Sequence, residues 1–224
     1  SGLTSQFGSM GKPYNAGIAA ANGVECATLA NLGFTSADDG LMGHQGFIGA
    51  HLPNGGSVTG PDMTFDSYKF PDNKYKLHAC CHGLHPMIEA LRASEAAAGV
   101  PLDDIRSFSL STNPRWLAVC DIKRPRTGLE VKFSYNWLAG MTLRGDNTAD
   151  DRLFTDTIAG EAELGRFAER ISVTGDDQLT DLQARGEISL TDGRAIPVWF
   201  DLADPFAPEV LAEKLQRKSS TIIG

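Results

Sequence analysis

The sequence is short of positive charge and of long apolar runs. Its 20 Lys and Arg residues are outnumbered by 28 Asp and Glu residues, so the formal net charge is −8. Nucleic acids and anionic membrane surfaces attract basic proteins, so we expect neither as a partner. No apolar stretch approaches the ~20 residues that a membrane-spanning helix needs. An acidic chain can still bind an acidic small molecule, but only through a local cluster of Lys, Arg and His.

Cysteine is scarce, and its arrangement argues against disulfides. The four cysteines are Cys26, Cys80, Cys81 and Cys120, and an adjacent pair does not suit a disulfide framework. The chain shows no signal peptide, so we expect a reducing, cytoplasmic compartment. The sequence begins at Ser1 and not at a Met, and we interpret it as a piece of a longer protein.

Phosphate-binding glycine loops, internal repeats and low-complexity segments are also missing. Helical and strand patterns are present without regular alternation, which predicts an α+β fold, an antiparallel sheet with packed helices. The helical patterns cover residues 12–33, 85–99, 130–143, 159–168 and 209–217, with a short helical turn within 42–50. The strand patterns cover residues 74–78, 105–110, 116–122, 170–174 and a hairpin of 187–190 with 195–200.

The hairpin is the clearest of these predictions. Asp192 and Gly193 form a turn signal between two alternating apolar and polar runs. Pro197 lies in the second run and has no N–H group to donate, so this strand should have an unpaired edge.

The first helical pattern, residues 12–33, differs from the others because it is apolar nearly all round. Pro13 suits the first turn of a helix and Gly33 suits its end. A helix of this kind needs close neighbours on several sides. We therefore expect it either to dock on a neighbouring chain or to be mobile.

Four segments carry a resemblance to a known family. Residues 7–17 include Lys12 and Pro13, and residues 76–90 include the run from Cys80 to Pro86. Residues 125–135 form the third segment, and the 191–194 turn with the helix around Lys214 forms the fourth. In order and spacing the four together resemble the MmgE/PrpD family of lyases and isomerases, which act on small di- and tricarboxylic acids.

The resemblance implies an organisation and a set of partners. Residues 1–40 would end the first part of an all-helical domain, 41–200 would form an inserted α+β lid, and 201–224 would return to the helical domain. The fold would thus be the lid with remnants of the helical domain. The resemblance also implies a homodimer, a small carboxylic-acid substrate, and neither a metal nor a cofactor.

The sequence departs from the family pattern at several positions. Asn15 replaces the His of the first segment, and Trp116 and Leu117 lie where a lid tyrosine is expected. A lid histidine used by one branch of the family falls on Cys81. The segment that supplies an Asp and histidines to the active site would lie before Ser1, so we expect the chain alone to be inactive.

The catalytic candidates are Lys12, His82 and His85. Lys12 opens a helix, where the dipole favours anions, so a carboxylate could meet both the ammonium group and free backbone N–H groups. His82 and His85 are three residues apart and titrate near neutrality, which suits proton transfer at a carbon next to a carboxylate. The alternatives are that Lys12 is a solvated flanking residue and that each histidine is a hydrogen-bonded packing residue.

Four further residues are candidates for binding the substrate: Lys76, Tyr14, Asn15 and Cys81. Lys76 would add a cation near the histidines, or would protect the edge of a strand against aggregation. Cys80 or Cys81 could also be a nucleophile, although buried inert thiols are commoner. We interpret Lys132, in the third segment, as structural.

The histidines and cysteines between residues 78 and 85 could also form a metal site. His78, Cys80, Cys81, His82 and His85 are residue types that bind zinc. Their spacing is poor, because adjacent cysteines on a strand point apart and no second pair of ligands occurs. We expect no metal.

These observations favour a cofactor-independent lyase or isomerase similar to 2-methylcitrate dehydratase, cis-aconitate decarboxylase or iminodisuccinate epimerase. The reaction would begin with removal of a proton next to a carboxylate, and would continue by loss of water, loss of carbon dioxide or reprotonation. The alternative is a non-catalytic module of the same fold that binds carboxylates or a partner.

Overall fold

The computed structural model of this chain describes residues 2–43, 45–52 and 73–223. Its contacts divide the chain into two compact units, Ser1–Tyr14 with Tyr75–Gly224 and Asn15–Lys74. No helix in the described ranges is long and apolar enough to cross a membrane.

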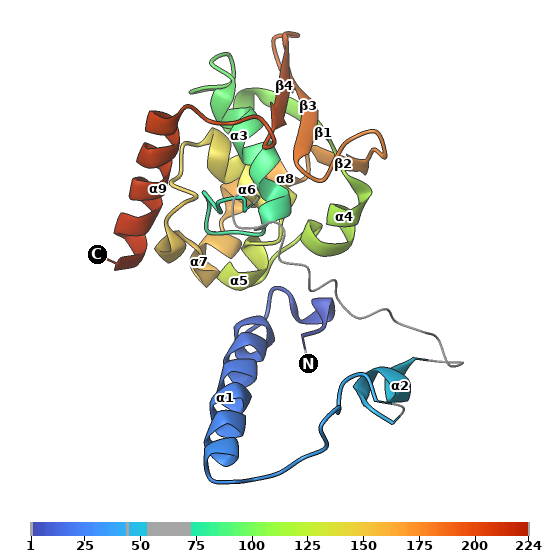
Figure 1. The fold of residues 1–224 in the computed structure, drawn as a ribbon. Coiled ribbons are helices and arrows are strands. Elements are labelled where there is room, and N and C mark those ends of the chain that lie inside the picture. Colours follow the sequence, from blue (N-terminus) through green and yellow to red (C-terminus); the bar gives the residue numbers. More distant parts are fainter. Residues whose placement is uncertain (1, 44, 53–72, 224) are drawn as a thin grey trace. The chain divides into compact units, whose positions relative to one another are not determined.

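The larger unit contains a four-stranded sheet and most of the helices (Figure 1). The strands are β1 (Ile105–Thr112), β2 (Ile171–Gly175), β3 (Gln183–Leu190) and β4 (Ala195–Asp201). The α-helices are α3 (His85–Ala93), α4 (Pro114–Cys120), α5 (Gly128–Val131), α6 (Tyr135–Leu143), α7 (Asp156–Ala159), α8 (Ala162–Ala168) and α9 (Pro208–Ile223). Short 3-10 helices are η1 (Thr4–Gln6), η4 (His82–Leu84), η5 (Leu102–Asp104) and η6 (Asp151–Leu153). The predicted α+β class is confirmed.

The sheet has the order β2-β1-β3-β4 and is mixed, which corrects the predicted antiparallel sheet. β3 pairs antiparallel with both β1 and β4, whereas β2 runs parallel to β1, with Phe108 opposite Ile171. The reason is the long connection between β1 and β2, which holds α4 to α8 and lets the chain return in the same direction.

The predicted hairpin is confirmed as β3 and β4. Gly193 adopts a φ of 91°, a left-handed conformation that glycine allows, and the Leu190 N–H donates to the Arg194 carbonyl at 2.8 Å. Pro197 lies on β4, which is an edge strand of the sheet, opposite Glu187 of β3. An edge strand is where a residue without an N–H group is tolerated.

The core lies between the sheet and the helices α3, α6 and α8. Met87 and Ile88 of α3, Leu138 of α6 and Phe167 of α8 are fully buried. Gly140 of α6 lets α8 approach closely, because a Cβ atom there would lie 2.8 Å from Leu164 Cδ2. This packing fixes the segments that carry the site described below.

Two predicted strands are wrong. Residues 74–78 form no strand, because a short alternation of polar and apolar residues indicates partial burial but supplies no pairing partner. Residues 114–120 form helix α4 instead of the strand predicted over 116–122. Asn113 caps this helix by accepting a hydrogen bond from the Arg115 N–H at 3.1 Å, and Pro114 occupies its first turn. These two start signals outweigh the strand-like composition that follows.

The predicted helices are confirmed with changed bounds. The pattern over 130–143 is two helices, α5 and α6, because Ser134 caps a new helix by accepting from the Trp137 N–H at 3.2 Å. The pattern over 85–99 ends at Ala93, that over 159–168 begins at Ala162 after the short α7, and that over 209–217 extends from Pro208 to Ile223. The turn predicted within 42–50 is α2 (Phe47–His51).

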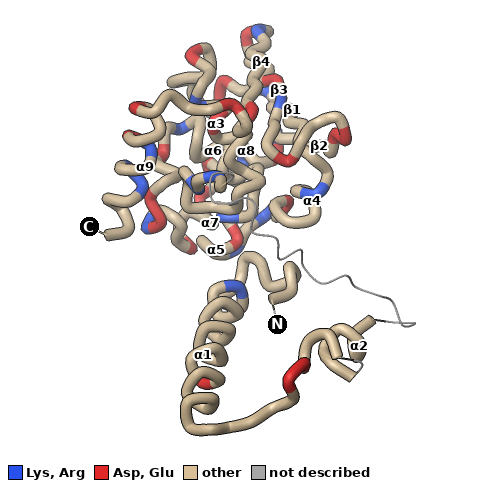
Figure 2. Tube along the Cα trace, in the orientation of Figure 1, with Lys and Arg blue, Asp and Glu red and all other residues tan. Residues whose placement is uncertain are grey.

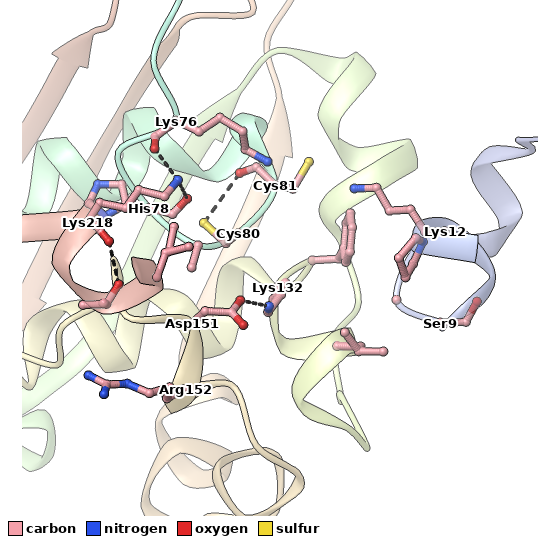
Figure 3. Close-up of a pocket in the computed structure, with 17 residues that line it drawn as sticks. Ser9, Lys12, Lys76, His78, Cys80, Cys81, Lys132, Asp151, Arg152 and Lys218 are labelled. Carbon is pink, nitrogen blue, oxygen red and sulfur yellow. Dashed lines mark hydrogen bonds and ion pairs between the residues drawn. The ribbon is translucent and has the colours of Figure 1, made fainter. Parts of the chain in front are cut away.

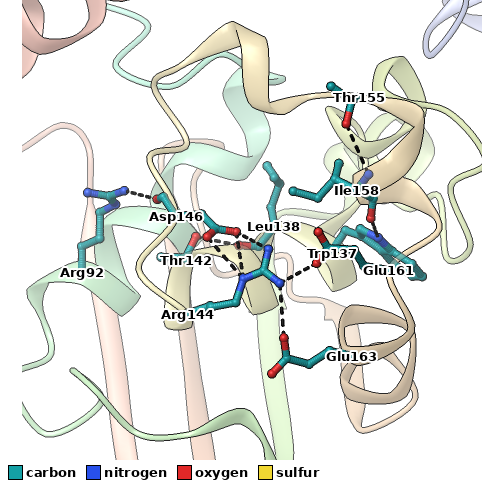
Figure 4. A network of polar contacts seen from close by, with 10 residues as sticks. All are labelled: Arg92, Trp137, Leu138, Thr142, Arg144, Asp146, Thr155, Ile158, Glu161 and Glu163. Atoms are coloured by element: carbon teal, nitrogen blue, oxygen red, sulfur yellow. Dashed lines mark hydrogen bonds and ion pairs between the residues drawn. The ribbon is translucent and has the colours of Figure 1, made fainter.

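A polar network centred on Arg144 joins the end of α6 to the start of α8 (Figure 4). Its guanidinium group pairs with Asp146 at 2.6 Å, Glu161 at 2.5 Å and Glu163 at 3.3 Å. Acidic side chains at the start of a helix are also favoured by the helix dipole. Neighbouring carboxylates raise the pKa of Arg144 above its ordinary value, with the hydrogen bond to Asp146 contributing most.

Helix α1 (Gly11–Asn31) confirms the first helical prediction and buries none of its residues. Its charged residues are Lys12 and Glu25, so almost the whole tube of α1 is tan in Figure 2. Val24, at 70 % exposure, and Ile18 and Leu29 on the same helix leave apolar surface open to solvent. In the described part of the smaller unit, α2 also buries no residue.

Candidate functional site

A cavity of about 510 Å³ opens in the larger unit. Five segments that are distant in the sequence form its walls: the start of α1, residues 76–81, the α5–α6 connection, η6 and the last turns of α9 (Figure 3). Cys80, Phe133 and Ile222 contribute apolar surface to these walls. A volume of this size suits a small molecule.

Cationic side chains dominate the polar lining. The cations are Lys12, Lys76, Lys132, Arg152 and Lys218, and the carboxylate is that of Asp151. Lys132 is ion-paired with Asp151, and Arg152 with Asp150 at 2.7 Å. Within the described ranges no carboxylate pairs with Lys12 or Lys76. These two ammonium groups carry the excess positive charge of the cavity together with that of Lys218, which donates to backbone carbonyls.

Two aromatic rings hold Lys12. Its Nζ atom lies 4.5 Å from the centre of the Phe7 ring and 4.7 Å from that of Phe133. The two rings contact each other, with their centres 5.4 Å apart. The faces of aromatic rings attract cations, so this pair orients the ammonium group without neutralising it. The predicted place of Lys12 at the start of a helix is also confirmed.

Backbone hydrogen bonds fix the segment that carries Lys76 and Cys81. The Ala79 N–H donates to the Thr148 carbonyl and the Cys81 N–H to the Lys132 carbonyl, each at 2.9 Å. Lys218 of α9 donates from its ammonium group to the carbonyls of Lys76 and His78. Burial lowers the pKa of Lys218, and the charge of Lys76 lowers it further.

His78 joins this segment to a buried network on α3 and α9. Its Nε2 atom lies 2.8 Å from Glu89 Oε1, and its Nδ1 atom 2.9 Å from Thr148 Oγ1. Lys214 donates to the other Glu89 oxygen at 2.7 Å. Burial raises the pKa of Glu89, but hydrogen bonds from His78 and Lys214 outweigh it, so the net shift is downward. Burial also lowers the pKa of His78, so we assign an ionised Glu89 accepting from a neutral His78.

The predicted histidines lie beside the cavity and do not line it. His85 is fully buried, and neither of its ring nitrogens has a hydrogen-bond partner. Its ring stacks on His82 and meets His78 edge-on, with ring centres 4.9 Å apart in both cases. Burial lowers the pKa of His85 well below its ordinary value, and that of His82 is also lowered.

The structure brings Lys12, Lys76 and Cys81 together, and places Tyr14 elsewhere. Tyr14 is 66 % exposed and does not line the cavity. Asn15 belongs to the smaller unit. In the described ranges no group of three or more His, Cys, Asp and Glu side chains is arranged to hold a metal ion.

The comparison with protein families identifies the family of the chain. A family model of the MmgE/PrpD C-terminal domain matches residues 78–224. The chain belongs to the MmgE/PrpD family. The family resemblance drawn from the four segments is thereby confirmed. A search of the curated proteins finds no match for the chain.

Three cavity residues of this MmgE/PrpD chain were not predicted as functional: Lys132, Arg152 and Lys218. Lys132 lies in a segment that resembles the family, and was interpreted as structural. Arg152 lies in η6 and Lys218 on α9, and nothing in the local sequence separates either from an ordinary surface cation. Only the fold brings these residues beside Lys76.

The arrangement suits the binding of an anion with several negative charges. Lys12 and Lys76 supply fixed positive charge, and the apolar walls reduce competition from water. A carbon next to a bound carboxylate becomes easier to deprotonate when cations stabilise the charge that develops. The cavity therefore has the features that chemistry on small polycarboxylates requires.

Proposed function

We propose that this chain forms part of a cofactor-independent lyase or isomerase that acts on small di- or tricarboxylic acids. The observation that carries the proposal is the cluster of five cations around one cavity in a chain of net charge −8. A global negative charge repels such acids, so a local cationic cavity is the feature that their binding demands. Membership of the MmgE/PrpD family supports the same chemistry.

Lys12 and Lys76 are proposed to hold the carboxylates of the substrate. Both lack a carboxylate partner among the described residues, so a ligand does not have to displace an existing ion pair. Lys132 and Arg152 are already paired and are proposed to complete the positive wall. Charged hydrogen bonds of this kind typically contribute ~1.5–3 kcal/mol each.

Lys218 is proposed to accept or return the proton. Its lowered pKa favours the neutral amine that a base requires, and its Nζ atom already lies among the backbone carbonyls of the cavity wall. Lys12 would stabilise the charge that develops on the carboxylate. His82 and His85 are proposed to act as positioning residues, since they pack behind residues 76–81. Loss of water, loss of carbon dioxide and reprotonation can all follow from the same first step.

A non-catalytic carboxylate-binding module is the second candidate. Asn15, which cannot transfer a proton as the family histidine would, favours it. The homodimer and the cytoplasmic location remain predictions, and sedimentation equilibrium would test the first of them.

Calorimetric titration tests the binding of acids. The full chain would be titrated with citrate, 2-methylcitrate, cis-aconitate and iminodisuccinate, and compared with Lys12→Ala, Lys76→Gln and Lys123→Gln. Lys123 lies outside the cavity and gives the same change of charge. We expect saturable binding of at least one acid, weakened about tenfold or more by the first two substitutions and unchanged by the third. Equal weakening by all three would refute a site at this cavity.

Exchange in heavy water tests the proposed role of Lys218. Proton NMR would follow each acid that binds, at the carbon next to its carboxylate. Deuterium incorporation that is lost in Lys218→Gln supports the lyase or isomerase. Saturable binding without any incorporation would refute Lys218 as the group that moves the proton.

A further inference from the structure

Three thiols form a cluster at the wall of the cavity: Cys80, Cys81 and Cys120. All three are buried, with exposed fractions of 3 %, 8 % and 0 %. Cys80 and Cys81 line the cavity, whereas Cys120 lies at the end of α4 behind Cys81. The proposed function uses none of these thiols as a reacting group.

The Cys81 sulfur has an environment that stabilises a thiolate. The neighbouring Cys120 thiol is the largest influence that lowers the pKa of Cys81, and the backbone of Gly83 lowers it further. The ammonium groups of Lys76 and Lys12 supply positive charge, and Figure 3 shows the sulfur between these two groups. Cysteines react in such electropositive surroundings where a reagent can reach the sulfur, and Cys81 lines the cavity.

The neighbouring thiol behaves in the opposite way. Burial raises the pKa of Cys80, and its Sγ atom donates to the Cys81 carbonyl at 3.6 Å. For Cys81, the hydrogen bond from Cys120 outweighs burial and lowers the pKa to about 6. The hydrogen bond to Cys81 raises the pKa of Cys120 most, and burial and the charge on Cys81 raise it further, so Cys120 keeps its proton and remains a donor. The fold therefore lowers the pKa of Cys81 and raises that of the adjacent Cys80.

We propose that Cys81 is a covalent modification site for small carboxylates that carry an electrophilic carbon. Lys76 and Lys12 bind the carboxylate and place that carbon beside the Cys81 sulfur. The sulfur then uses one electron pair to form a carbon–sulfur bond, while the bond to the leaving group breaks and the leaving group departs with its electron pair. The step needs neither an oxidant nor catalytic turnover by the protein. It rests on the same cationic cavity as the proposed function.

Two reagents that differ in charge test the proposal. Iodoacetate is an anion and iodoacetamide is neutral, and both transfer a two-carbon unit to a thiolate with loss of iodide. Rates at each cysteine of the full chain would be followed by mass spectrometry of peptides. Exposed Cys26 and free N-acetylcysteine serve as references for the intrinsic reactivity of the two reagents. A field that concentrates anions raises encounter rates tenfold or more, so we expect the iodoacetate-to-iodoacetamide ratio at Cys81 to exceed both references by about tenfold.

Matched variants assign the effect to its causes. Lys76→Gln should lower the iodoacetate rate at Cys81 about tenfold and change the iodoacetamide rate much less, while Lys123→Gln should change neither. Cys120→Ala should slow both reagents alike, because it removes a donor without removing charge, and Cys120→Ser should restore part of the rate. Cys81→Ser should abolish the fast labelling.

The proposal is overturned if Cys80 is the residue labelled, or if the ratio at Cys81 equals that of the references. Its failure can be told from that of the proposed function. Binding of citrate-like acids without charge-selective labelling refutes only the modification site. Charge-selective labelling of Cys81 in a chain that binds none of these acids supports the modification site and refutes only the proposed function.

Discussion

The larger unit and helix α1 show two ways in which this sequence forms helices. Helix α6 buries every one of its residues and packs against α3 and α8, whereas α1 buries none. α6 has nine residues, too few for a stable isolated helix, and it exists because packing holds it. α1 has 21 residues rich in alanine, so local propensity alone favours it. An apolar helix without buried residues nevertheless leaves surface that a partner would cover.

Hydrogen exchange should show the largest difference between these helices. Amides of α6 should exchange only through global unfolding, which costs ~5 kcal/mol or more in ordinary domains. Amides of α1 from Asn15 onward should exchange about a thousandfold faster in the monomer, because no residue of α1 is buried. Mass spectrometry at two protein concentrations would measure both. Protection of α1 that rises with concentration would indicate docking on a second copy, and strong protection in a dilute monomer would contradict the comparison.

Truncating a buried side chain of α8 and an exposed side chain of α1 should give the next largest difference, in the free energy of unfolding. Phe167→Ala removes a fully buried ring between α6 and α8 and should lower the free energy of unfolding by about 3–5 kcal/mol. Val24→Ala removes methyl groups that are 70 % exposed and should change it by less than about 0.5 kcal/mol. Urea denaturation followed by circular dichroism would measure both. A large effect of Val24→Ala would mean that the surface of α1 is covered in solution.

The sequence predicted the fold best where local signals act alone. The Asp192-Gly193 turn determines the β3–β4 hairpin by its backbone preference, so no tertiary information was needed. At residues 114–120 local signals conflicted, and the cap formed by Asn113 decided in favour of a helix. The parallel pairing of β1 and β2 depends on a connection of nearly sixty residues by count, about which periodicity says nothing.

The candidate site also contains some residues that the sequence predicted and others that only the fold reveals. Lys12, Lys76 and Cys81 were predicted because they lie in segments that resemble the family, and the structure brings all three to one cavity. Lys218 reaches that cavity from α9, 142 residues after Lys76, so only the fold reveals it. The contrast between Cys80 and Cys81 was equally beyond the sequence, because it depends on Cys120 and Lys12 approaching from other segments.

Acid should destabilise the larger unit through its buried histidines. Burial holds the pKa of His85 well below 6.5, its value in the unfolded chain. Below pH 6.5, His85 is therefore protonated in the unfolded state while it is still neutral in the folded state. The stability contributed by neutral His85 is fully present above pH 6.5 and is lost as the pH falls towards its folded pKa. His78 and His82 shift in the same direction and add to the loss.

Replacing His85 by leucine measures how much of the stability lost in acid is due to His85. Leucine has a similar volume and no polar atoms, so His85→Leu removes two buried nitrogens that have no partner and should raise the stability at pH 7.5 by ~1 kcal/mol. It should also reduce the loss between pH 7.5 and pH 5 by about 1–2 kcal/mol. Urea denaturation at both pH values measures the two effects, with His51→Leu as the exposed control. If His85→Leu kept the full acid loss, His85 would have to be hydrogen-bonded or protonated in solution, and the row of three histidines would need another explanation.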